Sequence, residues 1–143
     1  MIDLDNGYRL STDPKAMQIE AIHAYLARSY WSTGIPLSTV RIAVANSIGV
    51  GVFNDGEQVG FGRVTTDRAT FAYLADVYVL EDHQGQGLAQ AMVKALHDHP
   101  ELQGLRRWML ATSDAHGVYE KLGWTQVTDA APFMQRHFPD VYR

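Results

Sequence analysis

The stretch that decides the fold is FAYLADVYVLEDHQGQGLAQAMVKAL, from Phe71 to Leu96. Its first ten residues are rich in β-branched and aromatic side chains, which predicts a strand covered on both faces. Beyond the glycines, apolar residues recur at helical spacing, at Leu88, Ala91, Met92, Ala95 and Leu96. The stretch therefore predicts a buried strand, a glycine-rich turn and an amphipathic helix in direct succession.

The turn itself is Gln84-Gly85-Gln86-Gly87. Glycines let a ligand approach the main chain closely, because they carry no side chain. A helix that begins just after them offers unpaired N–H groups and the positive end of its dipole. We therefore expect this turn to bind an anion, and a phosphate-bearing ligand in particular.

Length and composition limit the class of protein. With 143 residues and 16.0 kDa, the chain is long enough for one domain, residues 1–143, with a core of its own. It has no cysteine, which excludes disulfides, thiolate zinc sites and a cysteine nucleophile. The cluster His97-Asp98-His99 reads as an exposed helix end, so we expect no metal.

The first residues, the hydropathy and the net charge predict the location of the protein and the class of its partners. The first residues show no signal-peptide pattern, and no run of about 18 apolar residues occurs. We therefore expect a soluble, cytoplasmic chain with no membrane partner. A formal net charge of −4 disfavours nucleic acid as a partner, since phosphate backbones bind basic surfaces. The same charge fits a small cationic substrate.

The first half of the chain predicts helices and antiparallel strands. Expected there are a short strand (Gly7 to Leu10), a helix with Asp13 as N-cap and Pro14 in its first turn that runs to about Arg28, a second helix opened by Pro36, and a β-hairpin from Ile48 to Thr65 that turns at Asn54-Asp55-Gly56. His23 lies on the apolar face of the first helix and is interpreted as a core histidine without a functional role.

The second half predicts one parallel pair. Expected there are a buried strand (Arg107 to Thr112), a short helix capped by Ser113-Asp114 and closed by Gly123, a last strand (Trp124 to Val127), and an apolar tail that packs down. The predicted fold class is α/β (α+β): one domain with a mixed sheet, antiparallel in its first half, and one parallel strand pair around the glycine-turn helix.

The spacing around the glycines separates the known phosphate-binding loops. A P-loop needs a lysine and a hydroxyl residue directly after its last glycine, where this chain has Leu88 and Ala89. A dinucleotide-binding fingerprint starting at Gly85 would place Gln90 where a third small residue is needed, and it belongs in the first βα unit of a parallel sheet. The P-loop is excluded and the dinucleotide fold is disfavoured.

At this turn the sequence resembles the GCN5-related N-acetyltransferase (GNAT) family, whose signature is Gln or Arg, two residues, Gly, one residue, then Gly or Ala. The run from Gln84 to Ala89 matches every fixed position. A second run, Ala115 to Trp124 (AHGVYEKLGW), is similar to the family's later Tyr-Glu-Lys-x-Gly-aromatic motif. With the order of elements, the resemblance covers Gln58 to Val127.

The resemblance implies acetyl-CoA as donor. Its pyrophosphate is expected on the main chain of Gln84, Gly85, Gln86, Gly87, Leu88 and Ala89, and its pantetheine arm on the exposed backbone of Val77, Tyr78 and Val79, where the parallel strands splay apart. Many family members have an asparagine, whose amide contacts the cofactor, where this chain has Thr112. Thr112, Ser113 or Asp114 is expected to replace it, and the sequence does not choose among them.

Two residues are candidates for the chemistry. By resemblance, Tyr119 points at the coenzyme sulfur, and a phenol can protonate a departing thiolate of similar basicity. Asp76, the only carboxylate within the central strand, has two interpretations: it accepts the amine's proton or binds a cationic substrate, or it pairs structurally with Arg63. The oxyanion donor is expected to be a backbone N–H near Val77.

The acceptor is the least determined part. The loop with Tyr30 and Trp31 either covers a pocket or fills the space between two helices, and Arg63 and Thr65 are further candidates for substrate contacts. The predicted function is direct acetyl transfer from acetyl-CoA to a primary amine of a small molecule or peptide. The competing hypothesis is a non-catalytic acetyl-CoA sensor or interaction module, and a homodimer is left open.

Overall fold

A six-stranded sheet runs through the molecule in the order β1-β2-β3-β4-β5-β6, so neighbours in sequence are neighbours in the sheet. The computed structural model describes residues 1–143. The strands are β1 (Ile2–Asp3), β2 (Tyr8–Ser11), β3 (Ile48–Asn54), β4 (Glu57–Thr66), β5 (Phe71–Val79) and β6 (Arg107–Met109). Every pair is antiparallel except β5 and β6, which are parallel. The predicted mixed sheet is confirmed.

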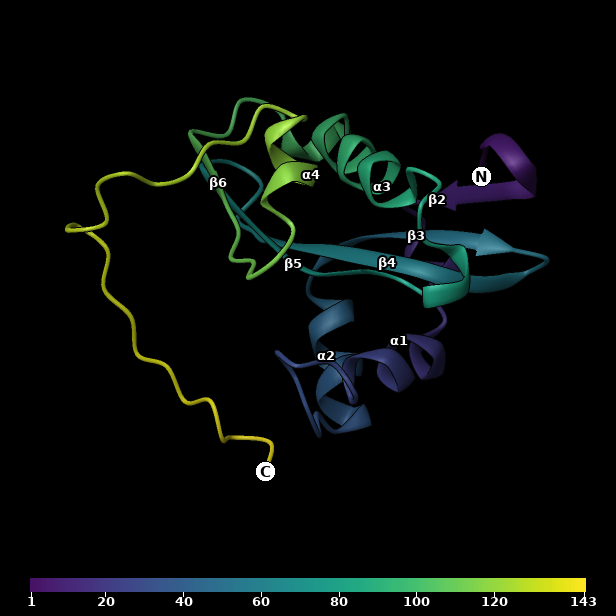
Figure 1. Cartoon of the computed structure of the whole chain (residues 1–143), viewed down its shortest axis with the longest axis horizontal. Helices are drawn as coiled ribbons and strands as arrows, with labels where there is room; N and C mark the ends of the chain where they lie inside the picture. Colours follow the sequence, from purple (N-terminus) through teal and green to yellow (C-terminus); the bar gives the residue numbers. More distant parts are fainter.

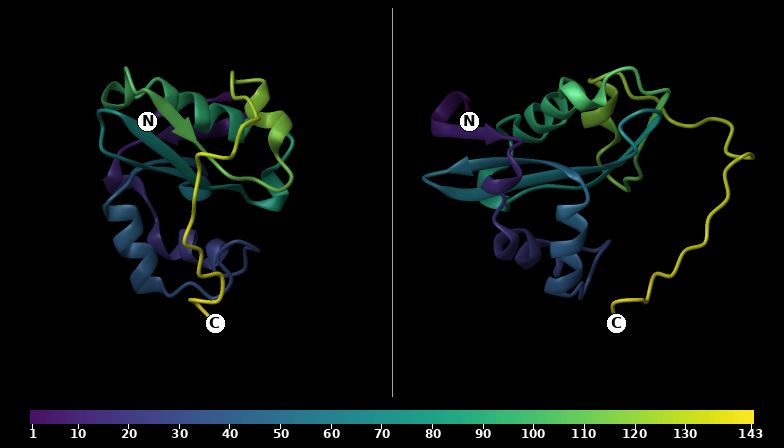
Figure 2. Two further views of the ribbon diagram at one scale, coloured as in Figure 1. Left: turned by 90° about the vertical axis from the view of Figure 1, so that its left-hand side faces the viewer. Right: turned by 180° about the vertical axis from the view of Figure 1, so that it is seen from behind.

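Helices cover both faces of this sheet. They are α1 (Ile19–Leu26), α2 (Leu37–Ala45), α3 (Leu88–His97) and α4 (His116–Glu120), with short 3₁₀ turns at Asp5–Gly7, Pro14–Ala16, Glu81–His83 and Pro100–Leu102. Figure 1 shows α3 and α4 on one face and α1 and α2 on the other, and the same layers are seen from behind in Figure 2. The predicted helix at Pro36 is confirmed, with Pro36 at the N-cap of α2.

Each face has its own core. The larger one joins the sheet to α3 through residues such as Val50, Leu74 and Met92, and the smaller one joins it to α1 and α2 through Ile22, Val40 and Phe61. Because side chains alternate along a strand, Ala72 and Leu74 of β5 face the larger core, while Phe71 and Tyr73 point the other way. Those two remain 37% and 39% exposed. The prediction that this strand is covered on both faces is thus wrong at its start, where neither α1 nor α2 reaches.

The β3–β4 hairpin is confirmed where the sequence predicts it. At its tip, Asp55 (φ 51°) and Gly56 (φ 79°) are both left-handed, the conformation of a tight two-residue turn that matches the twist of the strands. Its inward residues Ile48, Val50 and Val52 are all buried. The alternation of apolar residues and glycines therefore fixes the register of this hairpin.

The predicted helix from Pro14 to Arg28 is wrong in one respect, since the chain breaks it in two. Asp13 caps only the turn Pro14–Ala16, by accepting the N–H of Lys15 at 2.9 Å. Gln18 is then extended (φ −98°, ψ 94°) and exchanges hydrogen bonds with Gln58 of β4: each backbone N–H donates to the other's side-chain oxygen, at 2.8 and 3.0 Å. Because the two glutamines lie 40 positions apart in sequence, local helix propensity cannot predict these contacts.

Beyond α3 the chain forms less strand than predicted. β6 ends at Met109 rather than Thr112, and Trp124 to Val127 form no strand. Trp124 instead donates its indole N–H to His97 Nε2 at 3.1 Å and packs edge-on against Trp108. This aromatic anchorage directs the chain across the end of α3 rather than along the edge of the sheet.

The C-terminal arm, residues 128–143, also departs from expectation. Figures 1 and 2 show it bowing away from the domain and ending on the side of α1 and α2. All its residues are exposed, although the Arg107 guanidinium lies 5.1 Å from the Phe133 ring and the Tyr142 carbonyl lies beside Gly34. The prediction that this apolar tail packs down onto the domain is wrong.

The start of α4 differs from prediction, and its end agrees. Ala115 is the N-cap and no side chain caps the helix, so Ser113 and Asp114 do not act as caps; Thr112 Oγ1 instead accepts the N–H of Ala115 at 3.2 Å. At the other end Gly123 is left-handed (φ 94°), and the N–H of Trp124 donates to the Tyr119 carbonyl at 3.2 Å. This is the glycine-terminated helix end that the sequence predicts.

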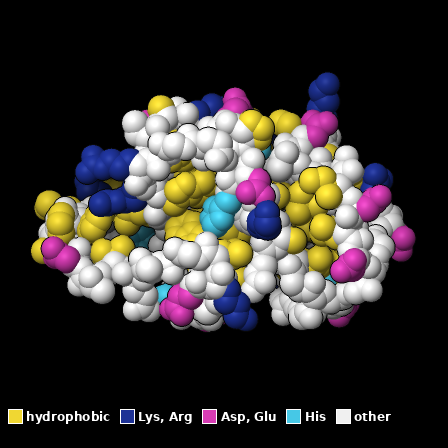
Figure 3. Space-filling view, turned by 90° about the horizontal axis from the view of Figure 1, so that it is seen from above, with side chains coloured by type: hydrophobic (Ala, Val, Ile, Leu, Met, Phe, Trp, Pro, Cys, Tyr) yellow, Lys and Arg dark blue, Asp and Glu magenta, His cyan; other side chains and the backbone are white.

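The surface carries charges of both signs. Figure 3 looks onto the face with α3 and α4 and shows Lys and Arg side chains interspersed with Asp and Glu. None of the helices combines the length and apolarity that a membrane span requires. His23 behaves as predicted, since its Nε2 is satisfied by the Ile35 carbonyl at 3.0 Å.

His97 makes stability depend on pH. Burial lowers its pKa from 6.5, and Nε2 must stay unprotonated to accept the Trp124 indole N–H. Because the unfolded chain takes up a proton more readily than the folded one, the stability from neutral His97 is present above pH 6.5 and is lost as pH falls through its lower folded pKa. Urea unfolding at about pH 8 and about pH 5 should show this loss. The fall in unfolding free energy between these two pH values should be smaller in His97→Gln. An equal fall in that variant would contradict the assignment of the pH dependence to His97.

Candidate active site

A β-bulge in β5 shapes the centre of the sheet. Opposite β4, the pairing moves from Arg63 with Ala75 to Phe61 with Tyr78, so that β5 holds one more residue than β4 in this interval. Asp76 lies in the bulge with a left-handed backbone (φ 58°), a conformation that costs free energy for a residue with a β-carbon and that Asp tolerates better than most. The surroundings of Asp76 must therefore hold it there.

Two donors hold the Asp76 carboxylate. Arg63 Nε donates to one oxygen at 2.7 Å and Trp31 Nε1 to the other at 2.8 Å. Arg63 also donates to the hydroxyls of Ser47 and Thr65, at 3.1 and 3.2 Å. Of the two interpretations of Asp76, pairing with Arg63 is thus present, and the pair further fixes the indole of Trp31.

Next to the bulge, the parallel strands part. The β5–β6 pairing ends at Tyr73 opposite Met109, so the backbone of Val77 to Val79 has β4 on one side and no strand on the other. An extended ligand with amide groups can complete such a strand edge. The splay predicted from the sequence therefore exists.

The glycine turn then supplies free donors. Gly85 (φ 81°) and Gly87 (φ 74°) are left-handed, and no backbone N–H from Gly85 to Gln90 donates a hydrogen bond within the protein. These groups gather at the start of α3, where the helix dipole is positive, as an anion-binding site requires. A side chain at either glycine would face open space, so the left-handed backbone and ligand access account for the two glycines.

The two glutamines of the turn brace it. Gln84 Nε2 donates to the Val79 carbonyl at 3.0 Å, which ties the turn back to β5. Gln86 Nε2 donates to the Tyr8 hydroxyl at 2.9 Å, which ties it to β2. Their side chains therefore shape the turn, and its backbone is what remains for a ligand.

The end of α1 and the turn after it form the other wall of the site. Arg28 makes a two-pronged ion pair with Glu81, at 2.7 and 3.0 Å, which lowers the pKa of Glu81 to about 2. The same guanidinium lies 4.4 Å from the centre of the Tyr25 ring, and that ring stacks on Tyr78 with 4.0 Å between centroids. The Tyr78 hydroxyl is buried without a partner, and burial raises its pKa.

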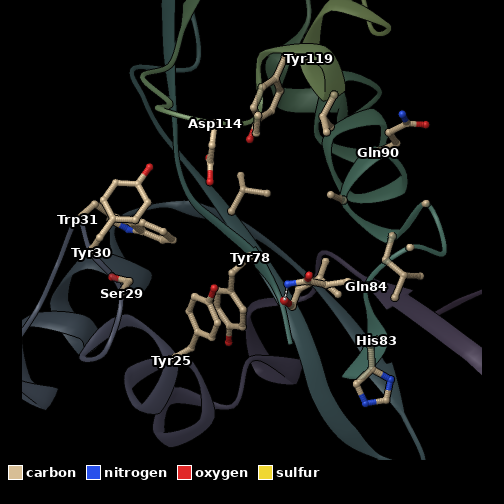
Figure 4. Close-up of a pocket in the computed structure, with 18 of the residues that line it drawn as sticks. Tyr25, Ser29, Tyr30, Trp31, Tyr78, His83, Gln84, Gln90, Asp114 and Tyr119 are labelled. Atoms are coloured by element: carbon tan, nitrogen blue, oxygen red, sulfur yellow. Dashed lines mark hydrogen bonds between the residues drawn. The ribbon is translucent and has the colours of Figure 1, made fainter. Parts of the chain in front are cut away.

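Two adjoining pockets result. The first, the turn pocket of about 690 Å³, lies between the glycine turn, Val77 to Val79 and α1. The second, the strand pocket of about 540 Å³, lies between β5 and the chain that follows β6. They share Tyr30, Trp31, Val77, Asp114, Ala115 and Tyr119. Figure 4 shows this shared region, with Tyr119 from α4, Asp114, and Tyr30 from the loop after α1 gathered around one space.

Tyr119 reaches this junction from α4. Its side chain is 8% exposed and its ring packs against Trp124 with 5.9 Å between centroids, while its hydroxyl has no protein partner. Burial, and then the charge of Asp114, raise the pKa of Tyr119 above 10.0. The phenol is therefore protonated at neutral pH and is a donor toward the pockets.

The structure brings most of the predicted residues together. The turn pocket contains Val77, Tyr78, Val79, Gln84, Gly85, Gly87, Leu88, Ala89, Asp114, Tyr119, Tyr30 and Trp31, and the strand pocket adds Asp76 and Thr112. Gln86, Arg63 and Thr65 line neither pocket. Arg63 is linked to the strand pocket only through the Asp76 carboxylate, and Thr65 only through its contact with Arg63.

Sequence reasoning missed residues on both pockets. Tyr25 at the end of α1, and Arg28 and Ser29 in the turn after it, line the turn pocket. Their i, i+3, i+4 spacing is the signal by which the sequence could have grouped them. Tyr73 and Leu110 line the strand pocket, and so does His137 from the C-terminal arm. His137 follows no motif, because only the path of the arm brings it there.

Comparison with known proteins assigns the fold and its site. Residues 11–124 match the model of the acetyltransferase (GNAT) family. The chain belongs to this family. Its reaction is therefore acetyl transfer, and the family resemblance seen in the sequence is confirmed.

Individual relatives agree with this assignment. A Gibberella zeae protein described as a putative acetyltransferase is 35% identical over 137 residues, which cover 80% of this chain and 76% of that protein. A GNAT structure from Xanthomonas campestris, also described as a putative acetyltransferase, is 46% identical, with a TM-score of 0.91 over 94% of this chain and 96% of that one. An acetyltransferase structure from Clostridium acetobutylicum with acetyl-CoA has the same fold at 15% identity, with a TM-score of 0.65 over 91% and 94% of the two chains.

The Asp76 pair should stabilise the bulge. Asp76→Asn keeps a residue that tolerates left-handed backbone but removes the charge opposite Arg63, whose side chain is only 20% exposed. We expect the free energy of unfolding to fall by about 2 kcal/mol, less than for a fully buried pair. Urea unfolding of Asp76→Asn, Arg63→Gln and the double variant measures the coupling. Additive losses in the double variant would contradict a direct interaction.

Proposed function

We propose that this GNAT protein is an acetyl-CoA-dependent N-acetyltransferase that transfers the acetyl group directly to a primary amine of a small molecule or peptide. The observation that carries the proposal is the junction of the two pockets at Tyr119. One pocket has the backbone donors that a pyrophosphate needs, and the other opens toward aromatic and acidic side chains. A donor and an acceptor can therefore meet without a covalent enzyme intermediate.

The turn pocket suits the donor in both charge and shape. The free N–H groups from Gly85 to Gln90 fit a pyrophosphate at the start of α3. The unpaired edge of Val77 to Val79 fits the amide groups of a pantetheine arm. The Clostridium protein, of the same fold, is known with acetyl-CoA. When bound, acetyl-CoA supplies an acetyl group activated as a thioester.

The residues at the junction have separate tasks in this proposal. Tyr119 gives its phenolic proton toward the departing sulfur, and a raised pKa keeps that proton available. A backbone N–H near Val77 stabilises the oxygen on which negative charge develops. Asp76, the proton acceptor predicted from the sequence, has both its oxygens engaged in hydrogen bonds, from Trp31 and Arg63. Tyr30 and Trp31 form the wall against which the amine lies.

The remaining expectations concern partners and location. A cytoplasmic location and the absence of nucleic acid, membrane and metal partners stay predictions. A homodimer is supported by the exposed apolar side chains of the C-terminal arm, among them Met134 (97% exposed), Phe138 and Val141.

A thiol-release assay tests the function. Acetyl-CoA is supplied with a panel of primary amines, amino acids and peptides, and thiol formation is followed with and without each acceptor. We expect acceptor-dependent thiol release, with the acetylated amine identified by mass spectrometry. Tight acetyl-CoA binding without turnover on any acceptor would favour the alternative, a coenzyme-binding sensor.

The donor site predicts the effect of Gly87→Glu. This change places a side chain and a negative charge in the open space before α3, where we expect the pyrophosphate. Acetyl-CoA affinity, measured by calorimetry, should fall by at least about 10-fold, since a pyrophosphate contact at a helix start is lost. Gly104→Glu is the matched control, because Gly104 has the same left-handed backbone (φ 73°), faces open space and lines neither pocket. Unchanged affinity of Gly87→Glu would overturn the placement.

Tyr119→Phe tests the proton donor. The hydroxyl makes no hydrogen bond within the protein, so its removal should leave the melting temperature and acetyl-CoA affinity nearly unchanged. We expect kcat to fall by about 10-fold or more, as for other positioned acids. Tyr142→Phe, in the exposed arm, is the control. Undiminished turnover of Tyr119→Phe would remove this residue from the chemistry.

A further inference from the structure

Two carboxylates line the strand pocket, and they differ in what surrounds them. Asp76 has both oxygens occupied, by Arg63 Nε and Trp31 Nε1. Its side chain is 9% exposed. A carboxylate in this state already has a cationic partner and a second donor, and taking up a proton would weaken both bonds. Asp76 is therefore the structural carboxylate of the pocket.

Asp114 is free by comparison. Its carboxylate makes neither an ion pair nor a hydrogen bond; only its backbone N–H is engaged, with Thr112 Oγ1. It is exposed and lines both pockets. Figure 4 shows its carboxylate directed into the same space that the Tyr119 hydroxyl faces. A negative charge without a partner thus lies where the two pockets meet.

The walls around Asp114 are fixed. Ser113 Oγ, one residue before Asp114, donates to the Tyr30 hydroxyl at 2.7 Å. Trp31 is held by Asp76, and the Tyr30 and Trp31 rings meet edge to face with 5.0 Å between centroids. These contacts join the loop after α1 to the loop before α4. A small cation between them meets a carboxylate and aromatic rings at once, the combination that binds ammonium groups.

The charge of Asp114 also acts on its neighbours. It raises the pKa of Tyr119, after burial, and contributes to the raised pKa of Tyr25. The remaining titratable groups on the turn pocket are Arg28, which is paired with Glu81, and Tyr78 and His83. On the strand pocket they are Tyr73 and Asp76 of β5, Tyr30 in the loop after α1 and His137 in the arm. None of them forms an ion pair with Asp114, so its negative charge is not neutralised by the protein.

We propose that Asp114 is the catalytic carboxylate that binds the acceptor's ammonium group and receives the proton the amine must lose before attack. This inference rests on the proposed function, and it gives Asp114 a task in place of the cofactor contact predicted from sequence. The neutral nitrogen then bonds to the acetyl carbon and the carbon–sulfur bond breaks. The sulfur leaves with the electron pair and takes a proton from Tyr119, which regains one from the nitrogen. Asp114 passes its proton to water.

The decisive variant is Asp114→Asn, which keeps the size of the side chain and removes its charge. With the amine that the wild-type enzyme acetylates, kcat/KM should fall by about 100-fold, within the usual contribution of a positioned base. Acetyl-CoA affinity and the melting temperature should stay nearly unchanged, since the carboxylate contacts nothing in the fold. Asp114→Glu should recover part of the loss. Asp55→Asn is the matched control, because Asp55 is exposed at the β3–β4 turn, lines neither pocket, and has a left-handed backbone that asparagine adopts readily.

The pH profile separates proton acceptance from simple binding. In the wild type, kcat/KM at low pH should be higher than the fraction of unprotonated amine in solution would allow, because Asp114 removes a proton from the bound ammonium group. In Asp114→Asn, kcat/KM should follow that fraction alone and rise about tenfold per pH unit below the amine's pKa.

Three results overturn the inference while the proposed function stands: kcat/KM of Asp114→Asn within about twofold of an active wild type, a loss confined to acetyl-CoA affinity, or an unchanged pH profile. If the wild-type protein acetylates no amine, the proposed function itself is contradicted, and the role of Asp114 with it.

Discussion

The bulge at Asp76 is the constraint on which the rest of the site depends. The β5–β6 pairing ends at Tyr73, just before the extra residue in β5, and Val77 to Val79 follow the bulge with no strand on that side. The left-handed backbone at Asp76 is unfavourable by itself, so it persists only because Arg63 and Trp31 hold the carboxylate. The bulge is therefore stabilised by a side chain of the neighbouring strand, Arg63 of β4, and by Trp31 from the loop after α1.

The same bulge links the two pockets. Through Trp31, Asp76 fixes the loop after α1 as one wall of the strand pocket. Through the splay, it leaves free the strand edge that borders the turn pocket. The Arg28–Glu81 pair then joins the turn after α1 to the segment before α3, so the turn pocket is closed by a second, independent contact. Donor and acceptor sites are coupled in position because both depend on how α1 is anchored to the sheet.

Much of this arrangement could be predicted from the sequence where local patterns decide it. The Asn54-Asp55-Gly56 turn, the glycine turn before α3 and the helix end at Gly123 all lie where the sequence predicts them, and each contains a left-handed residue. The family motifs then led to Tyr119. These features depend on short-range propensity and turn chemistry, and both can be predicted from the sequence.

The rest depends on contacts between distant residues. The break in the first helix comes from Gln18 and Gln58, and the missing last strand from the indole of Trp124 on His97. The site shows the same limit: Arg63 and Thr65 have the right chemistry for a substrate contact, but the register of β4 on β5 pairs Arg63 with Asp76, and neither residue lines a pocket. Residues from α1 and the C-terminal arm reach the pockets only through the tertiary path of the chain.

The two aspartates of the strand pocket show why residue type alone does not assign a role. Asp76 is the more conspicuous in the sequence, since a charge inside an apolar strand needs an explanation, and the explanation proves to be Arg63 and Trp31. Asp114 is inconspicuous, an aspartate in a polar loop where capping is the ordinary role. Because α4 is capped by no side chain and Thr112 supplies the turn's hydrogen bonds, the Asp114 carboxylate is left without a structural task. An unpaired charge beside a protonated phenol is then best explained by a ligand that brings the opposite charge.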